Sequence, residues 1–358
     1  MSNSFSGTVR CPICLEQINW RQAKEAGLFV FDEDSRRYEP LERRRGESEQ
    51  SWLHRTANAW IRCTNSDFYR HFLPVLYGAY GEPIIIVAVG TSNSGKTHLL
   101  TMLAAELERG TILAGKLSFQ PLDPTLGQIF RTNYVRPLIE ERQRLPYTGP
   151  TDDVFFMHAW RGYNHQTGRP FVLAFFDFSG EVLHRDNPPL TLNAASALIF
   201  LADPELIPGF GKRRSGSPLG DPTFSNICAR LKISHENERF IPLPIATVIS
   251  KSDLLQYQMP EVARWLLRDD DTDLSTVEQE SEDVYAFLAI KGGSPWLMPT
   301  HEFVSSTLHF VSATGTSAKD GYFPERQFGP RRVLRPLLSL LARTGVLKPG
   351  QLQDNRSE

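Results

Sequence analysis

The sequence predicts a doubly wound α/β protein in which a mostly parallel sheet follows a small cysteine-bearing module. Three observations predict this fold. Six apolar runs of strand length lie between about residues 82 and 315, helical patterns separate them, and a glycine-bounded loop follows the first run. Strands that alternate with helices along a chain are typical of a parallel sheet with helices on both faces.

The candidate strands are almost continuously hydrophobic, which suits strands that are buried on both faces. In chain order they are 83–89 (PIIIVAV), 153–160 (DVFFMHAW), 170–178 (PFVLAFFDF), 196–203 (SALIFLAD), 243–250 (LPIATVIS) and 306–313 (STLHFVSA). Apolar residues at helical spacing predict a helix over 99–107, which Gly110 ends. The pattern of 331–347 predicts a closing amphipathic helix with Pro336 in its first turn, where proline costs little.

Composition excludes several classes of protein. The chain has 358 residues, of which 41% are hydrophobic and 22% charged, as in a soluble globular protein. A net charge of -2 gives no bulk attraction to nucleic acid or to anionic lipid. The apolar runs are too short for membrane insertion. Four cysteines do not make a disulfide framework in a chain of this size, so we expect a reducing, cytoplasmic compartment.

Changes in composition predict three parts. Residues 1–80 are expected to form the cysteine-bearing module with a charged, solvated linker around 34–50, residues 81–348 the sheet domain, and residues 349–358 a flexible tail. Residues 207–222, rich in Gly, Pro and Ser, are expected to form an exposed loop. The acidic stretch 268–283 is interpreted as a solvated loop and helix start rather than a metal site.

The loop after the first strand carries the most specific motif. Residues 90–97, GTSNSGKT, match the pattern G-x-x-x-x-G-K-[ST]. Its glycines let backbone N–H groups surround a phosphate, and the following helix points its positive end at the same anion. Lys96 is expected to reach the β- and γ-phosphates, and Thr97 to bind Mg²⁺. We therefore assign nucleotide binding to Gly90, Asn93, Ser94, Gly95, Lys96, Thr97 and His98.

A second acidic partner for Mg²⁺ is expected at the end of the 170–178 strand. Asp177 begins the sequence Asp177-Phe178-Ser179-Gly180, at a position downstream of the loop where such a carboxylate belongs. Asp177 would hold the ion through water, and the Gly180 N–H would sense the γ-phosphate.

Two strand ends predict which base is read. Residues 250–253, SKSD, resemble the [NT]-K-x-D box that reads guanine, with Ser250 in place of Asn or Thr. Asp253 can accept two hydrogen bonds from guanine, whereas adenine would leave this buried carboxylate without donors. The Lys251 stem would lie along the purine face. The turn at Ser312-Ala313-Thr314 looks like the S-A-[KL] turn whose backbone contacts the guanine carbonyl.

These motifs, in this order, resemble those of the TRAFAC-clade GTPases, which include Ras-like switches and translation factors. Within that clade, "CPICL" at 11–15, the block from Ile61 to Leu100 and "RRVLRPLLSLLAR" at 331–343 are similar to the bacterial double-GTPase family of predicted multi-gene conflict systems. The resemblance implies a sheet of the P-loop GTPase type, binding of GTP and GDP, and a protein effector or second GTPase as partner. Oligomeric state stays open.

Two further roles are placed by analogy with such switches. A threonine before the 153–160 strand should reach Mg²⁺ when GTP is bound; Thr148 and Thr151 both fit, and we prefer Thr151. Glu181 occupies the position where Ras-like enzymes carry a water-orienting glutamine, beside Gly180. Its charge near the γ-phosphate predicts slow, partner-stimulated hydrolysis. Glu181 as a helix cap or solvent-facing residue is the alternative.

The N-terminal cysteines predict a zinc-ribbon-like site. Cys11 and Cys14 have the C-x-x-C spacing that lets two thiolates bind one Zn²⁺, and Cys63 is the expected third ligand. Without a second C-x-x-C, the fourth ligand would be His54, Asp67 or His71. A metal-free relic of the fold and a redox pair are the alternatives. Cys228 is interpreted as a core residue.

Three functions are therefore weighed. The leading hypothesis is a cytoplasmic GTP-binding switch with slow, Mg²⁺-dependent hydrolysis. If SKSD were only a turn, the chain would be a P-loop ATPase. The third hypothesis is a nucleotide-binding scaffold that never hydrolyses its ligand.

Overall fold

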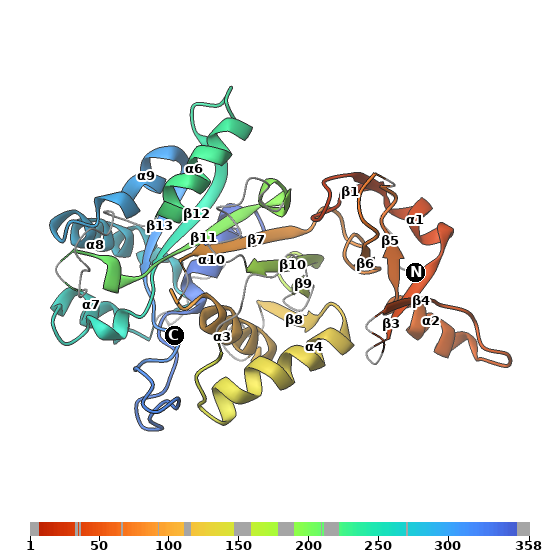
Figure 1. Ribbon diagram of the computed structural model, residues 1–358, viewed down its shortest axis with the longest axis horizontal. Coiled ribbons are helices and arrows are strands. Elements are labelled where there is room, and N and C mark those ends of the chain that lie inside the picture. The colour runs from red at the N-terminus through yellow and green to blue at the C-terminus, as the bar shows by residue number, and fades with distance from the viewer. Residues whose placement is uncertain are drawn as a thin grey trace.

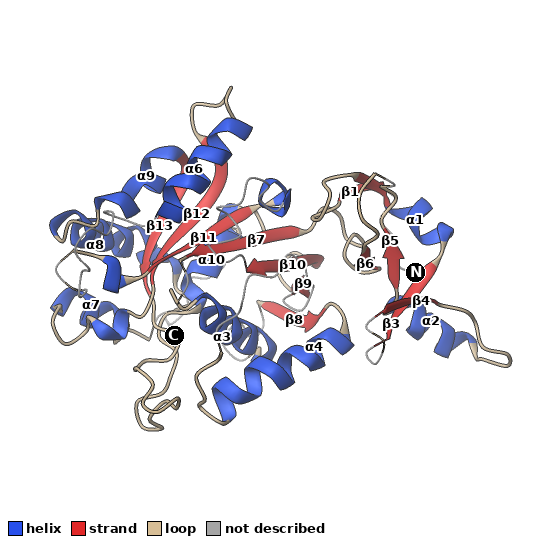
Figure 2. Cartoon of the chain, in the orientation of Figure 1, coloured by secondary structure: helices blue, strands red, loops and turns tan. Residues whose placement is uncertain are grey.

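A mixed, seven-stranded sheet forms the centre of the computed structural model (Figures 1 and 2). The structure describes residues 7–32, 35, 37–65, 67–91, 93–110, 116–146, 159–177, 190–208, 210, 222–269 and 271–348. The strand order is β13-β12-β11-β7-β10-β9-β8. The strands are β7 (Ile84–Gly90), β8 (Leu117–Pro121), β9 (Ala159–Asn164), β10 (Arg169–Asp177), β11 (Ala197–Ala202), β12 (Ile241–Ile249) and β13 (Phe303–Phe310).

Most of this sheet is parallel. β7 pairs in parallel with β10 and with β11, and β12 pairs in parallel with β11 and β13. The other two pairs, β9 with β10 and β9 with β8, are antiparallel. The predicted α/β fold is therefore confirmed, and the predicted runs correspond to β7 and β10–β13. The run at 153–160 lies mostly outside the described residues, and β8 was not predicted because its sequence, LSFQP, is not a continuous apolar run.

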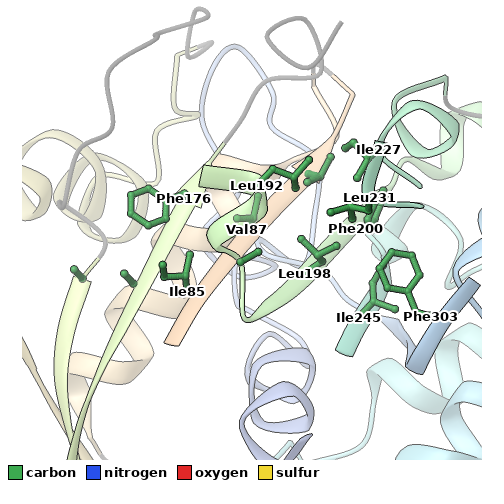
Figure 3. Packing of buried hydrophobic residues seen from close by; sticks show 14 of the residues in the cluster. Ile85, Val87, Phe176, Leu192, Leu198, Phe200, Ile227, Leu231, Ile245 and Phe303 are labelled. Carbon is green, nitrogen blue, oxygen red and sulfur yellow. The ribbon is translucent and has the colours of Figure 1, made fainter. Parts of the chain in front are cut away.

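Strands alternate the faces to which their side chains point, and here both faces are covered. Ile85, Val87 and Val89 of β7 belong to one buried cluster, which Figure 3 shows together with residues of β11 and α6 (Pro222–Ser234). Ile86 and Ala88 belong to the other, with α3 (Lys96–Arg109) and α10 (Leu334–Arg343). Pro336 is the third residue of α10, in the first turn as predicted.

The remaining helices of this region connect the strands. A ten-residue π-helix with Pro137 inside it, η1 (Arg131–Glu140), directly continues α4. The other elements are α4 (Pro124–Phe130), η3 (Leu190–Ala194), η4 (Pro204–Leu206), η5 (Ser252–Leu254), α7 (Pro260–Leu266), η6 (Leu274–Thr276), α8 (Val277–Ile290), η7 (Ser294–Leu297) and α9 (Met298–Glu302). Within the described residues, no helix combines the length and the apolarity needed to cross a membrane.

The N-terminal region has sheets of its own. Strands β1 (Thr8–Arg10) and β2 (Gln17–Asn19) form a hairpin, and a second sheet has the order β4-β3-β5-β6. Its strands and the two nearby helices are β3 (Leu28–Asp32), β4 (Arg37–Pro40), β5 (Trp60–Arg62), β6 (Phe72–Pro74), α1 (Trp20–Ala26) and α2 (Glu49–Ala57). The interpretation of 34–50 as a linker was therefore wrong for residues 37–40 and 49–50, which belong to β4 and α2.

The N-terminal region and the large sheet share one buried cluster. Trp60 of β5 donates a hydrogen bond from Nε1 to Oδ2 of Asp123 at 2.9 Å, and Oδ1 of Asp123 caps α4 by accepting from the N–H of Leu126. Val9 and Trp60 lie in the same hydrophobic cluster as Ile85. The two regions are therefore packed together through buried side chains as well as through the chain itself.

Candidate functional site

The loop between β7 and α3 is closed around its own lysine. Gly95 begins α3 with φ +88°, in the left-handed region that favours glycine. Nζ of Lys96 donates to the carbonyl oxygens of Gly90 and Thr91, at 2.8 and 3.0 Å. A Cβ on Gly90 would lie only 2.8 Å from Oγ of Ser94, so this position needs glycine for close approach. The sequence from strand through turn to helix is the context that the motif requires.

Asp177 lies beside this loop because β10 ends next to β7. Oγ1 of Thr97 donates to Oδ2 of Asp177 at 3.3 Å. Among the described residues, Oδ1 of Asp177 is buried without a hydrogen-bond partner. Burial raises the pKa of Asp177, while the charge of Lys96 and the bond from Thr97 lower it. A hydroxyl beside a half-buried carboxylate is a pair of ligands that fits Mg²⁺. We call this end of the site, with Gly90–Thr97, the loop end.

A second carboxylate is held at the end of β12. Asp253, 8% exposed, accepts a hydrogen bond at Oδ1 from Oγ of Ser312 at 2.5 Å. The same Ser312 oxygen accepts from the N–H of Gly315 at 2.8 Å, so the hydroxyl proton is directed at the carboxylate. Burial raises the pKa of Asp253, and the Ser312 bond lowers it. We call this part of the site, with Lys251, the carboxylate end.

Lys251 is held by two carboxylates of the neighbouring strand end. Its backbone has φ +47°, and its Nζ donates to Asp203 at 2.6 Å and to Glu205 at 3.2 Å. Asp203 follows β11 and also caps η4 by accepting from the N–H of Glu205. These two ion pairs hold the lysine side chain beside the end of β11.

One cavity of about 760 Å³ is lined by both ends of the site. It is bounded by Asn93–Leu99 and Asp177 at the loop end, and by Ser250, Lys251, Asp253, Ser312 and Ala313 at the carboxylate end. It lies at the carboxyl ends of the parallel strands. The two neighbours of β7 in the sheet, β10 and β11, both follow it in the chain. Ligands of open α/β sheets bind at such a switch point. The volume is in the usual range for a small-molecule site.

The far wall of the cavity was not predicted. It consists of residues 143–146, after η1, and of residues 316–318 and 320–323, within the long connection between β13 and α10. A signal for the second segment exists in the sequence. Asp320-Gly321 is a dipeptide typical of tight hairpins, and both residues have positive φ, +51° and +85°.

A buried ion cluster lies behind the carboxylate end. Glu280 is fully buried and accepts from Nε of Arg335 at 2.6 Å and from Nη2 of Arg332 at 3.0 Å. It also accepts from Nδ1 of His309 and from the N–H of Phe310, the last residue of β13. Residues 268–283 do include a helix start, but the expectation that they are solvated was wrong for Glu280.

This cluster braces the turn that carries Ser312. Arg331 and Ser312 exchange two backbone hydrogen bonds, at 2.8 and 3.1 Å, immediately beside Arg332. Burial alone would raise the pKa of Glu280, but His309 and the Arg332 guanidinium hold that pKa well below its usual range. The carboxylate is therefore ionised and paired wherever the protein is folded near neutral pH.

The N-terminal cysteines form the one Cys/His cluster of its kind in the described part of the chain. The ligand atoms of Cys11, Cys14, Cys63 and His71 all lie within 4.8 Å of one another. The two sulfurs of Cys14 and Cys63 are 3.6 Å apart, close to the roughly 3.8 Å that a tetrahedral site with Zn–S bonds of about 2.3 Å requires. Three thiols and an imidazole in this arrangement could hold Zn²⁺.

Hydrogen bonds orient the side chains of this cluster. Nδ1 of His71 lies 2.7 Å from the carbonyl of Tyr69, to which it donates, so Nε2 presents its lone pair toward Cys11 at 3.2 Å. Hydrogen bonding to Cys11 and the charge of His71 lower the pKa of Cys63, which favours the thiolate form that binds metals. Of the three candidates for the fourth position, His71 is the one brought to the cysteines. Cys228 lies apart, 3% exposed in the core.

Several predicted residues lie outside the described residues. Thr148, Thr151, Gly180 and Glu181 are among them, and so is most of the 207–222 stretch. Their assignments stay predictions.

Comparisons with known proteins give no close relative. The chain matches no family model, and no curated protein matches it. Among solved structures it is similar to the S. cerevisiae Ski7 GTPase-like domain bound to GTP, at 12% identity and TM-score 0.30, over 75% of this chain and 51% of that one. It is also similar to a variant of SsGBP (14%, TM-score 0.25, 76% and 58%) and to the bacterial selenocysteine-specific elongation factor EF-Sec (14%, 0.25, 64% and 26%). This chain therefore spans about half of the Ski7 domain's chain and about a quarter of the EF-Sec chain. TM-scores this low establish no relationship.

Proposed function

We propose that this protein is a GTP-binding switch that hydrolyses GTP slowly with Mg²⁺. The observation that carries the proposal is the single cavity shared by the loop end and the carboxylate end. The motifs at the two ends, 90–97 and 250–253, are separated by more than 150 residues in the chain. The first is expected to contact the phosphates of a nucleotide, and the second its base.

The residues at the loop end fit a triphosphate with its metal. Lys96 already donates to two oxygens of the loop and would exchange them for phosphate oxygens. Mg²⁺ would be held by Thr97 and Asp177, where it would neutralise charge on the phosphates. Oδ1 of Asp177 is a buried atom with no hydrogen-bond partner among the described residues, which supports this assignment because such an oxygen is otherwise costly.

The carboxylate end favours guanine over adenine. Ser312 orients Asp253 by binding one of its oxygens, and guanine offers the N–H donors that the carboxylate needs. Adenine offers no such pair of donors, so the buried charge would be left unsatisfied.

Calorimetry tests base choice directly. GTP and ATP are titrated with Mg²⁺ into the wild type, Asp253→Asn and, as a matched control, the exposed Asp269→Asn. We expect GTP to bind at least tenfold more tightly than ATP, and Asp253→Asn alone to remove that preference. Equal or tighter ATP binding that Asp253→Asn leaves unchanged would instead indicate an ATPase.

Phosphate release in single-turnover experiments tests hydrolysis. A changed rate of release in Glu181→Gln would support the role proposed for Glu181, and an unchanged rate would exclude it. GTP binding with no release would indicate a scaffold that does not hydrolyse its ligand.

The family resemblance supports a role for the switch in a bacterial multi-gene conflict system, with an effector or second GTPase as its partner. Partner genes beside this one are expected on that proposal, and a gene that stands alone would count against it.

We further propose that Cys11, Cys14, Cys63 and His71 hold a structural Zn²⁺, which would stabilise the N-terminal region. Atomic emission should find one zinc per chain in the wild type. It should find the metal lost in His71→Ala and retained in His54→Ala, whose side chain is exposed on α2. Equal zinc in both variants would exclude His71 as a ligand.

A further inference from the structure

The connection between β13 and α10 forms part of the cavity wall. It pairs with residues 142–144, which lie far from it in the sequence. We call residues 313–330 the strap. Its two ends are held together by the backbone bonds between Ser312 and Arg331, and inside them the N–H of Gly329 donates to the carbonyl of Thr314 at 3.0 Å. Gly315, with φ +74°, allows this close approach, because a Cβ there would lie 2.5 Å from the Gly329 oxygen. The strap is therefore a closed and defined loop.

The tip of the strap is a tight hairpin that pairs with residues 142–144. Lys319 and Tyr322 exchange two backbone hydrogen bonds around Asp320-Gly321. Beyond this turn, the N–H of Arg144 donates to the Gly321 carbonyl at 2.8 Å, and the N–H of Phe323 donates to the Arg142 carbonyl at 2.7 Å. Gln143 and Tyr322 lie opposite one another in this short antiparallel pairing.

Side chains anchor the pairing to the helix that follows the phosphate loop. Phe323 is 7% exposed and packs against Phe328, with ring centroids 5.6 Å apart, and edge-on against His98 at 6.0 Å. Nε2 of His98 accepts a hydrogen bond from the N–H of Leu145 at 3.3 Å. Burial, together with the charge of Arg144, lowers the pKa of His98 to about 4, so its ring is neutral and able to accept this bond.

These contacts connect three segments that line the same cavity: α3 through His98, residues 143–146, and strap residues 320–323. We propose that the pairing of 142–145 with 321–323 and His98 is a latch, which holds the bound nucleotide in the cavity and must open for the nucleotide to leave. His98 and Phe323 act as positioning residues of that latch. The inference rests on the proposed function, because it takes the cavity's ligand to be a nucleotide.

The paired residues allow the latch to be locked reversibly. Gln143 and Tyr322 lie opposite one another, and the backbone hydrogen bonds on either side of this pair join only their chain neighbours. They are therefore a non-hydrogen-bonded pair, with an expected Cα separation of about 4.5 Å. A disulfide spans separations of about 4.4–6.8 Å. Both side chains are exposed, so the double variant Gln143→Cys/Tyr322→Cys places two thiols where an oxidant can join them.

The experiment measures release of a fluorescent GDP analogue from the full chain. The double variant is loaded in reducing buffer and then either oxidised or kept reduced before excess unlabelled GDP is added. We expect oxidation to slow release at least tenfold and reduction to restore it. The single variants Gln143→Cys and Tyr322→Cys control for oxidation of the native cysteines, and their release should not depend on the oxidant.

A second variant tests the opposite direction without any oxidant. Phe323→Ala removes the ring that packs against His98 and Phe328. It should speed release by about tenfold, because loss of a buried aromatic side chain weakens the closed pairing. Equal release from the oxidised and reduced double variant, with the disulfide verified by mass, would overturn the latch while leaving nucleotide binding established. If no variant and no wild-type protein binds the analogue, the proposed function fails and the latch fails with it.

Discussion

The two ends of the cavity are built in different ways. The loop end lines the cavity almost entirely with one contiguous stretch, Asn93–Leu99, to which β10 adds Asp177. The carboxylate end is assembled from separate strand ends, and it depends on Ser312, on the acids that hold Lys251 and on a buried ion cluster. The loop end is therefore encoded locally, whereas the carboxylate end depends on tertiary structure, so mutations far from the ligand should affect the second more than the first.

The largest expected effect comes from the ion cluster behind the carboxylate end. Glu280→Gln removes the buried carboxylate that two buried guanidiniums share, so we expect the free energy of unfolding to fall by about 3–5 kcal/mol in urea titrations. The exposed Glu282→Gln, on the same helix, should change it by less than about 0.5 kcal/mol. Similar losses in the two variants would show that the cluster does not brace this end.

Next in size is the effect of Lys96→Ala at the loop end. Loss of a charged hydrogen-bond donor to phosphate should weaken binding by about 1.5–3 kcal/mol. Because the change lies at the loop end, calorimetry should find the same loss for GTP and ATP, with the base preference unchanged. A selective loss for one nucleotide would break the proposed separation of roles.

Acid should weaken the carboxylate end through Glu280. Its pKa in the folded protein lies below the ordinary value of 4.5. The unfolded chain therefore binds a proton there first, and stability falls as the pH drops below about 4.5, by up to about 1.4 kcal/mol per pH unit for this group. Urea titrations from pH 7 to pH 3.5 should show the stability gap between wild type and Glu280→Gln narrowing below pH 4.5. A constant gap would contradict this assignment.

The smallest expected effect compares one glycine from each end. Gly95 and Gly315 both have positive φ, but a Cβ on Gly95 would meet nothing within 4 Å, whereas one on Gly315 would meet the Gly329 oxygen at 2.5 Å. Without nucleotide, Gly95→Ala should cost about 1 kcal/mol of backbone strain. Gly315→Ala should cost about 1 kcal/mol more by thermal unfolding. Equal costs would mean that the strap shifts freely.

The sequence predicted the locally encoded parts of the molecule better than the parts that depend on tertiary structure. The strands β7 and β10–β13 and the helix α3 could be predicted because buried parallel strands and the loop motif leave a local pattern. Lys251, Asp253 and Ser312 were also proposed from strand ends, and the fold brings all three to one cavity.

What could not be predicted depends on contacts between distant residues. Glu280 sits in an acidic stretch and carries no local sign that Arg332 and Arg335 will bury it. The partnership of Asp203 with Lys251 likewise exists only because β11 and β12 are neighbours. His71 was one of three candidates for the fourth ligand, and sequence spacing alone could not separate them.

The hydrogen bond between Trp60 and Asp123 predicts what happens when the N-terminal region is removed. Asp123 starts the helix that runs on as η1 toward Gln143 and Leu145, and its second oxygen is satisfied by the indole of the N-terminal region. A chain beginning at Glu82 would lack the indole that binds this oxygen, and it would expose the apolar surface around Leu122 and Leu126. Such a shortened protein would be expected to aggregate, so the nucleotide-binding part should be studied with its cysteine-bearing neighbour attached.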